Sequence, residues 1–314
     1  MSDFDIVVLP HDAYGRNYGL FIADKLPCVL GSSLAGIVEQ LGPDASPFKV
    51  GDHVFGISNM TCPTADQAGL QQYAILQTDS IAHVPEVITD DQAATFPVNI
   101  ATVAITLFTK DFGFGFPAPW ENKPFDFSDE PIVILGAGTN AARLFTRIAT
   151  KVLGVKNIIA VASLSNESEL SEAGASHVID RHLSEDEIIA QVHKAAGGAE
   201  NVTRIFDCAS WDHHLAAALF AEGKPTRLIT LHPVHEDKVR EDRPLCKASL
   251  VHMTNDNLGS HAKPFWKTLP RWIEAGIIRP TAFYTIDGLD ADAVDKQLDQ
   301  YAAGKGLTHL IVHP

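Results

Sequence analysis

The sequence predicts an α/β protein of two domains, one rich in β-strands and one built on a doubly wound parallel sheet. Its 314 residues are enough for two domains that each bury a core of their own. Short β-branched runs separated by turn residues occupy residues 1–95. From residue 131 onward, apolar runs alternate with amphipathic helical patterns, which indicates β-α-β units and a sheet covered on both faces.

The N-terminal part is expected to form short strands, because each apolar run in it is bounded by turn-forming residues. The turn signal LGPDASP at 41–47 is the clearest of these boundaries. The expected strands are DIVVL (5–9), AGIVEQL (35–41), DHVFGI (52–57) and QQYAIL (71–76).

A helical pattern replaces the strand pattern near residue 90. Thr89, followed by Asp90 and Asp91, has the composition of a helix N-terminus. The Phe- and Pro-rich stretch 113–131 then follows, and it is longer than an ordinary connection. We therefore interpret it as the border or lid of a binding site.

Strands and helices then alternate as far as residue 233. The expected strands are PIVILGAG (131–138), IIAVAS (158–163), HVID (177–180), RIFDCAS (204–210) and RLITLHP (227–233). The expected helices between them cover 140–154, 165–174, 183–198 and 213–223. The last part of the chain predicts a helix (263–276), an extended segment (279–286), a helix (290–304) and a closing strand (308–314).

Composition narrows the class of protein and its compartment. A net charge of −15 argues against nucleic acid as a partner, because phosphate binding needs clustered Lys and Arg. The sequence has no apolar run of the roughly 18 residues that a membrane span needs, and no basic start typical of a signal peptide. We expect a cytoplasmic protein that does not bind membranes. Four scattered cysteines indicate ordinary buried thiols rather than disulfides or a structural zinc site: Cys28, Cys62, Cys208 and Cys246.

The strongest chemical signal is ILGAGTNAARLF at 134–145, where a strand leads through a glycine turn into a helix. Such a turn lets the backbone approach a pyrophosphate, and the helix N-terminus offers free amides and a favourable dipole. The third small position of this fingerprint holds alanine, which still permits close packing. The residues expected to hold the pyrophosphate are Gly136, Gly138, Thr139, Asn140 and Ala141.

The end of the second strand of this region favours NADPH over NADH. An NAD site usually has Asp or Glu there, whereas this chain has Ser163. Ser163 and Asn166 can donate hydrogen bonds to a 2′-phosphate, and Arg181 is the cation that we place within reach. Leu231 lies toward the end of a later expected strand, next to the loop expected to border the nicotinamide.

Several segments taken together resemble the medium-chain dehydrogenase/reductase family. They are VLGSSLAGIVEQLGPDASPFKVGDHVFG (29–56), AGLQQYAIL (68–76), FPVNIATVAITLF (96–108) and the glycine motif, in this order. The resemblance covers nearly the whole chain. It implies a GroES-like catalytic domain formed by residues 1–97 and 278–314, and a Rossmann dinucleotide-binding domain formed by 98–277. It also implies hydride transfer by a nicotinamide coenzyme.

The chain departs from the zinc-dependent members of this family at Ser32-Ser33, where those members have His-Glu. Hydroxyl groups cannot replace an imidazole as a zinc ligand, so we expect no zinc. Within the family the chain is most similar to zinc-free, quinone oxidoreductase-like members and to fungal enoyl reductases that act in trans with polyketide synthases. The natural metal-free reaction is reduction of an activated C=C bond, in an enoyl thioester or enone.

Two residues are candidates for catalysis. Tyr14 lies in LPHDAYGRNYG (9–19), which resembles the segment lining the family's substrate cleft, at a position where enoyl reductases often have lysine. It is a candidate proton donor, or else an aromatic lid. Thr102 matches a threonine near the nicotinamide in relatives, although a threonine near a helix start can also be a plain cap. Asp12 is expected to be structural.

Three functions remain open from the sequence. The first is an NADPH-dependent enoyl or enone reductase, whose substrate is a small molecule or an acyl chain on coenzyme A or a carrier protein. The second is a quinone or small-aldehyde reductase with the same hydride step. The third is a catalytically degenerate NADPH-binding protein that acts as the partner of a polyketide synthase; the alanine in the glycine motif and the absent lysine favour it.

Overall fold

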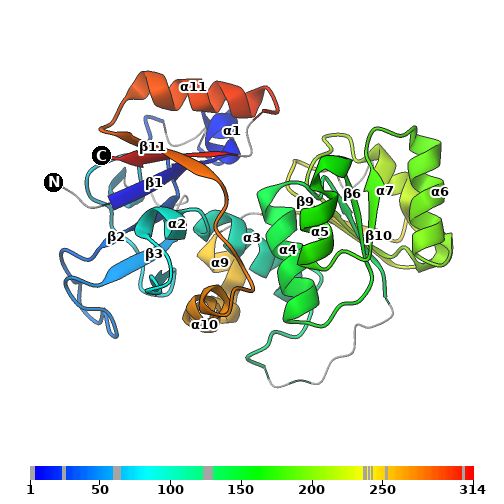
Figure 1. Ribbon diagram of the computed structural model, residues 1–314, viewed down its shortest axis with the longest axis horizontal. Coiled ribbons are helices and arrows are strands. Elements are labelled where there is room, and N and C mark those ends of the chain that lie inside the picture. Colours follow the sequence, from blue (N-terminus) through cyan, green and yellow to red (C-terminus); the bar gives the residue numbers. More distant parts are fainter. Residues whose placement is uncertain are drawn as a thin grey trace. The chain divides into compact units, whose positions relative to one another are not determined.

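The computed structural model describes residues 4–22, 26–58, 65–121, 123, 130–235, 239, 241, 243–251, 254–305 and 308–314 (Figure 1). The chain divides into two compact units. Unit 1 comprises Met1–Ala101 and Met253–Pro314, and unit 2 comprises Thr102–His252. Residues 253–277 are predicted from the sequence to belong to the nucleotide domain, whereas contact clustering in the structure places them in unit 1.

Unit 1 is built on a six-stranded sheet with the order β11-β12-β1-β2-β3-β4. Neighbouring strands are antiparallel except for β11 and β12, which are parallel. The strands are β1 (Phe4–Val8), β2 (Ser33–Ile37), β3 (His53–Ile57), β4 (Ile81–His83), β11 (Phe283–Asp287) and β12 (His309–His313). The first strand of the chain therefore pairs with the last, with Ile6 opposite Val312.

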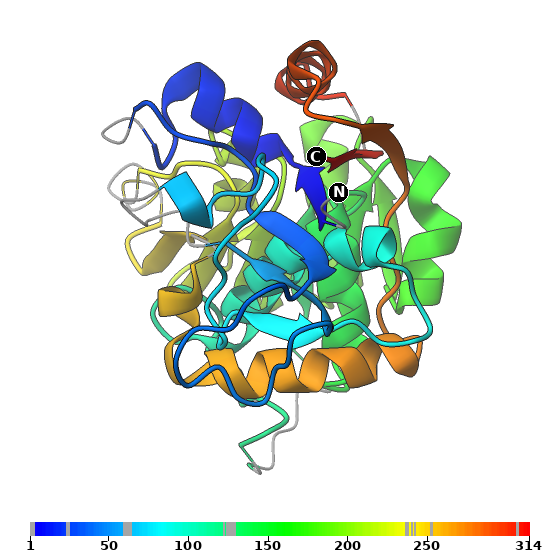
Figure 2. The ribbon, with the colours of Figure 1, turned by 90° about the vertical axis from the view of Figure 1, so that its left-hand side faces the viewer.

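Five helices of unit 1 accompany this sheet in the part of the chain that the structure describes. They are α1 (Pro10–Tyr18), α2 (Asp90–Ala94), α9 (Asn255–Leu258), α10 (Ala262–Glu274) and α11 (Ala291–Ala302), with short 3-10 turns at Ala65–Gln67 and Gly259–His261. Helix α11 packs on α1 and β1, and α10 packs beside β4, as Figure 2 shows with α10 in orange. The ring of Trp266 on α10 meets Phe55 of β3 edge-on at 6.3 Å.

Unit 2 is a six-stranded sheet in which every neighbouring pair is parallel, with the order β10-β9-β8-β5-β6-β7. The strands are β5 (Ile132–Leu135), β6 (Ile158–Ala162), β7 (His177–Asp180), β8 (Arg204–Asp207), β9 (Thr226–Thr230) and β10 (Cys246–Leu250). The helices are α4 (Asn140–Lys151), α5 (Glu167–Ala173), α6 (Glu185–Ala195) and α7 (His214–Leu219), with 3-10 turns at Leu164–Asn166 and Ala199–Asn201. Counted from β5, the strand order is 3-2-1-4-5-6, which defines the Rossmann fold.

Local sequence explains where several helices begin. Ser184 and Glu187 form a reciprocal capping box at the start of α6, and Thr89 and Gln92 form another at α2. Helix α3 (Pro97–Phe108) runs from one unit into the other, and Pro97 at its first position separates it from α2. The single helical pattern expected after Thr89 is thus two helices.

The structure corrects one predicted strand. Residues 71–76 form no strand, although their sequence alternates between polar and apolar residues. Tyr73 and Ile75 are 66% and 57% exposed, and the amide of Ile75 donates to the carbonyl of Asp66 instead of to a neighbouring strand. The strand that completes this edge is β4, which pairs with β3 and was not expected.

The structure also locates three of the four cysteines and part of the long loop. Cys208 and Cys246 are buried free thiols and Cys28 is a partly buried one, whereas Cys62 lies outside the described residues. In the loop at 113–131, residues 122 and 124–129 also lie outside them, and Trp120 packs edge-on against Phe108 of α3 at 5.1 Å. None of the helices that the structure describes combines the length and apolar character needed to cross a bilayer.

A buried aspartate–histidine pair lies where β8 ends. Oδ2 of Asp207 is 2.9 Å from Nδ1 of His213, and both residues are almost fully buried. The other carboxylate oxygen accepts the amides of Ala209 and Ser210, at 3.1 and 3.0 Å. Nε2 of His213 is 3.3 Å from the carbonyl oxygen of Pro233. Burial lowers the pKa of His213, but the hydrogen bond and charge of Asp207 outweigh it, so the pKa is raised.

This ion pair predicts a pH-dependent stability. A histidine pKa raised above its unfolded value of about 6.5 stabilises the protein fully below that pH, and the contribution is lost as pH rises through the folded pKa. We expect His213→Asn, which suits the left-handed backbone at φ 56°, to lower the thermal midpoint by about 2–4 °C per kcal/mol lost. The deficit should be larger at pH 6 than at pH 9. An equal deficit at both would contradict a charged His213.

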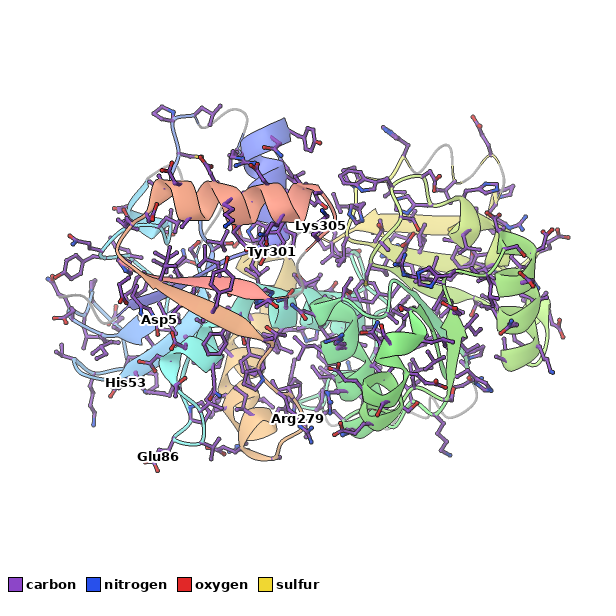
Figure 3. The ribbon with its side chains drawn as sticks, turned by 45° about the horizontal axis from the view of Figure 1, so that its top comes forward. Asp5, His53, Glu86, Arg279, Tyr301 and Lys305 are labelled. Atoms are coloured by element: carbon purple, nitrogen blue, oxygen red, sulfur yellow. The ribbon has the colours of Figure 1, made fainter. Side chains whose placement is uncertain are left out.

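The buried Tyr301 is expected to contribute to the stability of unit 1. Tyr301 of α11 lies over the strands beneath it (Figure 3) and donates its hydroxyl to the carbonyl of Val8, at 3.1 Å. We expect Tyr301→Phe to lower the free energy of unfolding by roughly 1–2 kcal/mol, because the buried carbonyl loses a partner. Urea unfolding measures this. Tyr284→Phe is the control: its hydroxyl binds Gln297, but its ring is 44% exposed, so its loss should be smaller.

Candidate functional site

The site of unit 2 is placed by the order of its strands. Strands β5 and β8 are hydrogen-bonded neighbours, with Leu135 opposite Asp207. The chain leaves β5 toward β6 and leaves β8 toward β9, so the two connections diverge from this point. In open α/β sheets, ligands bind outside the carboxyl ends of the strands where the order diverges in this way.

The turn after β5 needs glycine for two reasons. Gly136 has a φ of +70°, a left-handed conformation that favours glycine. A Cβ atom there would also come within 2.6 Å of the Cβ of Ala209, in the segment after β8. At Gly138, a Cβ would lie 3.0 Å from Nδ2 of Asn166. The backbone of this turn is therefore packed closely against the segments that follow β8 and β6.

Helix α4 begins at the end of this turn. The hydroxyl of Thr139 caps it by accepting the amide of Ala142, and the next two residues, Asn140 and Ala141, are buried. The amides of a first helical turn have no acceptor within the helix, and their dipoles add up to a partial positive charge. The five residues predicted for the pyrophosphate thus lie together in this turn and helix start.

The end of β6 carries hydroxyl and amide groups. Ser163 follows β6 directly, and its hydroxyl is 3.0 Å from that of Ser165. Nδ2 of Asn166 donates to the carbonyl of Ser163, at 3.3 Å. Arg181 follows β7, where its amide donates to Ala162 of β6 and its side chain is exposed. Three predicted coenzyme residues therefore lie at adjoining strand ends.

A second cation, not predicted from the sequence, is also present here. Arg143, in the first turns of α4, donates from Nη2 to Oδ1 of Asn166 at 2.7 Å. Its Nη1 lies 3.1 Å from Oε2 of Glu169. The spacing of Arg143 after the glycine turn was visible in the sequence, but its contact with a residue 23 positions away was not.

The ends of β8 and β9 complete this edge of unit 2. Leu231 follows β9, and its amide donates to the carbonyl of Asp207 at 3.1 Å. His232 is buried, with its ring 4.4 Å from that of Trp211, and burial lowers its pKa. The Asp207–His213 pair lies at the end of β8, at this same edge of the sheet.

In unit 1, Tyr14 lies on α1. Its ring is partly buried, and the ring of Tyr18 is 6.4 Å away, one turn later. Burial raises the pKa of Tyr14, and the neighbouring Tyr18 raises it further. Its hydroxyl therefore carries a proton at neutral pH, as a proton donor requires.

Asp12 on the same helix is structural, as expected. Its side chain is buried, and its two oxygens accept the amides of Leu9 and Gly31, at 2.9 and 3.1 Å. These bonds fix α1 against the start of β2. Arg16 does not bind Asp12; it pairs with Asp295 and Asp299 of α11.

Both hydroxyls of the Ser32-Ser33 pair have hydrogen-bond partners. Oγ of Ser32 is 2.7 Å from Nε2 of His11, and this nitrogen is 3.5 Å from Oδ1 of Asp12. Oγ of Ser33 donates to the carbonyl of Ala94 at 2.8 Å. Both serines are buried, and they connect β2 to α1 and α2. The contact of Ser32 with His11, 21 residues away in the chain, has no signal in the sequence.

Thr102 lies in the sixth position of α3, not at its start, so it is not the helix cap. Its side chain is 6% exposed, and its carbonyl accepts the hydroxyl of Thr106 at 2.8 Å.

A separate group of potential ligand atoms occurs in unit 1, where side-chain atoms of Asp5, Asp91 and His313 lie within 4.8 Å of one another. Figure 3 labels Asp5 on β1.

Comparisons with known sequences agree with this architecture. Residues 6–86 match the model of the alcohol dehydrogenase GroES-like domain. The dehydrogenase orsE of Emericella nidulans is 26% identical over 325 aligned positions, which cover 98% of this chain and 89% of that protein. The enoyl reductase component lovC of the lovastatin nonaketide synthase, from Aspergillus terreus, is 31% identical over 152 positions, covering 48% of this chain and 41% of lovC.

Solved structures share the fold. A candidate zinc-dependent alcohol dehydrogenase from Rhizobium etli superposes with a TM-score of 0.78 at 21% identity, covering all of this chain and 88% of that one. Quinone oxidoreductase from Escherichia coli, in complex with NADPH, superposes with a TM-score of 0.72 at 18% identity, covering all of this chain and 90% of that one. The chain therefore contains a GroES-like domain and a Rossmann sheet, and in sequence and fold it is similar to oxidoreductases of the medium-chain dehydrogenase/reductase superfamily.

Proposed function

We propose that the protein is an NADPH-dependent, metal-free oxidoreductase that reduces an activated C=C bond in an enoyl thioester or enone. One observation carries this proposal: the glycine turn after β5 adjoins a β6 end that has Ser163 in place of a carboxylate. An acidic residue there would bind the ribose of NAD and repel a 2′-phosphate. The relationship to lovC supports the enoyl substrate, and the NADPH complex with the same fold supports the coenzyme.

The residues present fit such a coenzyme. A side chain at Gly136 would collide with Ala209, and one at Gly138 would press against Asn166, so the turn that leads into α4 presents bare backbone. The pyrophosphate would be held by Gly136, Gly138, Thr139, Asn140 and Ala141; the 2′-phosphate side by Ser163, Asn166 and Arg181; and Leu231 would border the nicotinamide. Bound NADPH would supply the hydride.

The protein's own part in the reaction is to stabilise charge and to move a proton. Negative charge develops on the carbonyl oxygen of a conjugated substrate, and a donor lowers the barrier by bonding to it. Tyr14 is the proposed proton donor, because its raised pKa keeps the phenol protonated. The hydroxyl of Thr102 is proposed to bond to this oxygen or to the coenzyme amide.

The metal-free character is proposed from the two serines. At the step where zinc-dependent relatives have His-Glu, this chain has two hydroxyls already bonded to His11 and to the carbonyl of Ala94. Thiolate, imidazole and carboxylate are the usual zinc ligands, and neither serine offers one.

A second candidate is reduction of a quinone by the same hydride step, which the shared fold of the E. coli quinone oxidoreductase supports. The third, an NADPH-binding partner of a polyketide synthase without turnover, is distinguished by activity alone. A cytoplasmic location and a carrier-bound acyl substrate remain predictions from the sequence.

Coenzyme binding and turnover test the proposal. We expect the purified protein to bind NADPH at least about tenfold more tightly than NADH, because one lost charge-assisted contact corresponds to this factor or more. Titration calorimetry measures both affinities. NADPH absorbance should then fall with crotonyl-coenzyme A or a longer enoyl thioester. Turnover with quinones alone would favour the second candidate, and tight binding without any turnover the third.

A chelator provides the control for the metal. Turnover should be unchanged after dialysis against a strong zinc chelator, and elemental analysis should find no stoichiometric zinc. Loss of activity that returns with added zinc would contradict metal-free chemistry.

Tyr14→Phe tests the proton donor. We expect kcat for the enoyl substrate to fall by about tenfold or more, because general acid catalysis contributes factors of 10²–10⁴. NADPH affinity should not change. Tyr18→Phe is the matched control, since it removes the same hydroxyl one turn later from a ring that is 73% exposed. Equal rates for both variants would remove Tyr14 from the mechanism.

A further inference from the structure

We propose that Arg143 is the residue that selects NADPH, by binding its 2′-phosphate from the side of α4. This inference rests on the proposed function and assigns the main phosphate ligand within that site. The sequence alone predicts Arg181 for this role. Arg181 has an exposed side chain at the end of β7, whereas Arg143 is joined to the glycine turn through Asn166.

Asn166 brings the guanidinium and the turn together. Its side-chain amide lies against Gly138, where an added Cβ would be 3.0 Å away. Its Oδ1 accepts Nη2 of Arg143 at 2.7 Å, and its Nδ2 donates to the carbonyl of Ser163. One amide group therefore contacts the phosphate-binding turn, the residue after β6 and the guanidinium. In this fold the adenine ribose is recognised at the end of the second strand, which here is β6.

Arg143 has donors left for a phosphate. A guanidinium carries five N–H groups in a planar fork, and the contacts with Asn166 and Glu169 use two of them. Both partners hold the side chain in one orientation, and 19% of it is exposed. A fixed guanidinium loses little side-chain freedom when it binds a dianionic phosphate, which suits bidentate recognition.

A substitution of Glu169 distinguishes phosphate binding by Arg143 from a purely structural role. Its carboxylate, 44% exposed, neutralises Arg143 before a ligand arrives and competes with a phosphate for the same N–H groups. If Arg143 only linked α4 to α5, removing either partner of the ion pair would have the same consequence. If Arg143 binds the 2′-phosphate, removing Arg143 weakens the binding of NADPH, whereas removing the charge of Glu169 does not.

The test measures the affinities of NADPH and NADH by titration calorimetry, with the thermal midpoint of each variant recorded without coenzyme. Arg143→Leu should weaken NADPH by about tenfold or more and leave NADH within about twofold, because a charge-assisted contact to the 2′-phosphate alone is lost. Glu169→Gln should leave NADPH binding equal or tighter. Lys151→Leu is the charge-matched control, since it removes a cation from the far end of α4 and should alter neither affinity.

Arg143→Lys keeps the proposal testable if the leucine variant does not fold. It retains the charge but not the fork, so it should lose NADPH affinity by a few-fold while NADH is unaffected. Equal weakening of both coenzymes would show a structural link or a pyrophosphate contact, and no change would show no contact; either overturns the inference. If the unaltered protein binds neither coenzyme, the proposed function itself is wrong.

Discussion

The close approach of two backbone segments at Gly136 is the constraint on which the nucleotide unit depends. The turn after β5 passes so near Ala209 that a single Cβ atom would force the two apart. Strands β5 and β8 are hydrogen-bonded neighbours, so their outgoing segments must share this space. The same outgoing segment of β8 supplies the amides that Asp207 accepts, which orients its carboxylate toward His213. Glycine at one position therefore permits both the phosphate-type turn and the buried ion pair beside it.

In the GroES-like unit, hydrogen bonds perform the connecting role at Ser32 and Ser33. Each hydroxyl joins β2 to a different helix, one through His11 and the other through the carbonyl of Ala94. The buried carboxylate of Asp12 accepts two further hydrogen bonds, from backbone amides. Hydrogen bonds from these side chains therefore hold the start of β2 against α1 and α2.

Much of the fold was predictable because its signals are local. The apolar runs of β5, β6, β8 and β9 and the capping pairs at α2 and α6 lie within short windows of sequence. Helix α1 was not expected, because its polar sequence includes Gly15, and the contacts that hold it come from Gly31 and from α11. Strands β4 and β10 were missed as short edge strands whose partners define them.

The same distinction between local and long-range signals applies to the site. The glycine turn is a contiguous motif, so its five residues were identified from the sequence, while their contact with a coenzyme remains a prediction. Arg143 and His11 were missed because each meets its partner across more than 20 residues of chain. Such contacts depend on the direction of a side chain after the elements have packed, and periodicity does not contain that information.

The pairing of β1 with β12 has a consequence for the order in which the chain assembles on the ribosome. Unit 2 is continuous from Thr102 to His252, so all of its strands have emerged before the final segment is translated. Unit 1 cannot finish its sheet at that stage, because Ile6 must wait for Val312 and Arg16 for Asp299. One edge of β1 therefore stays unpaired through most of synthesis, and such edges invite pairing with other chains.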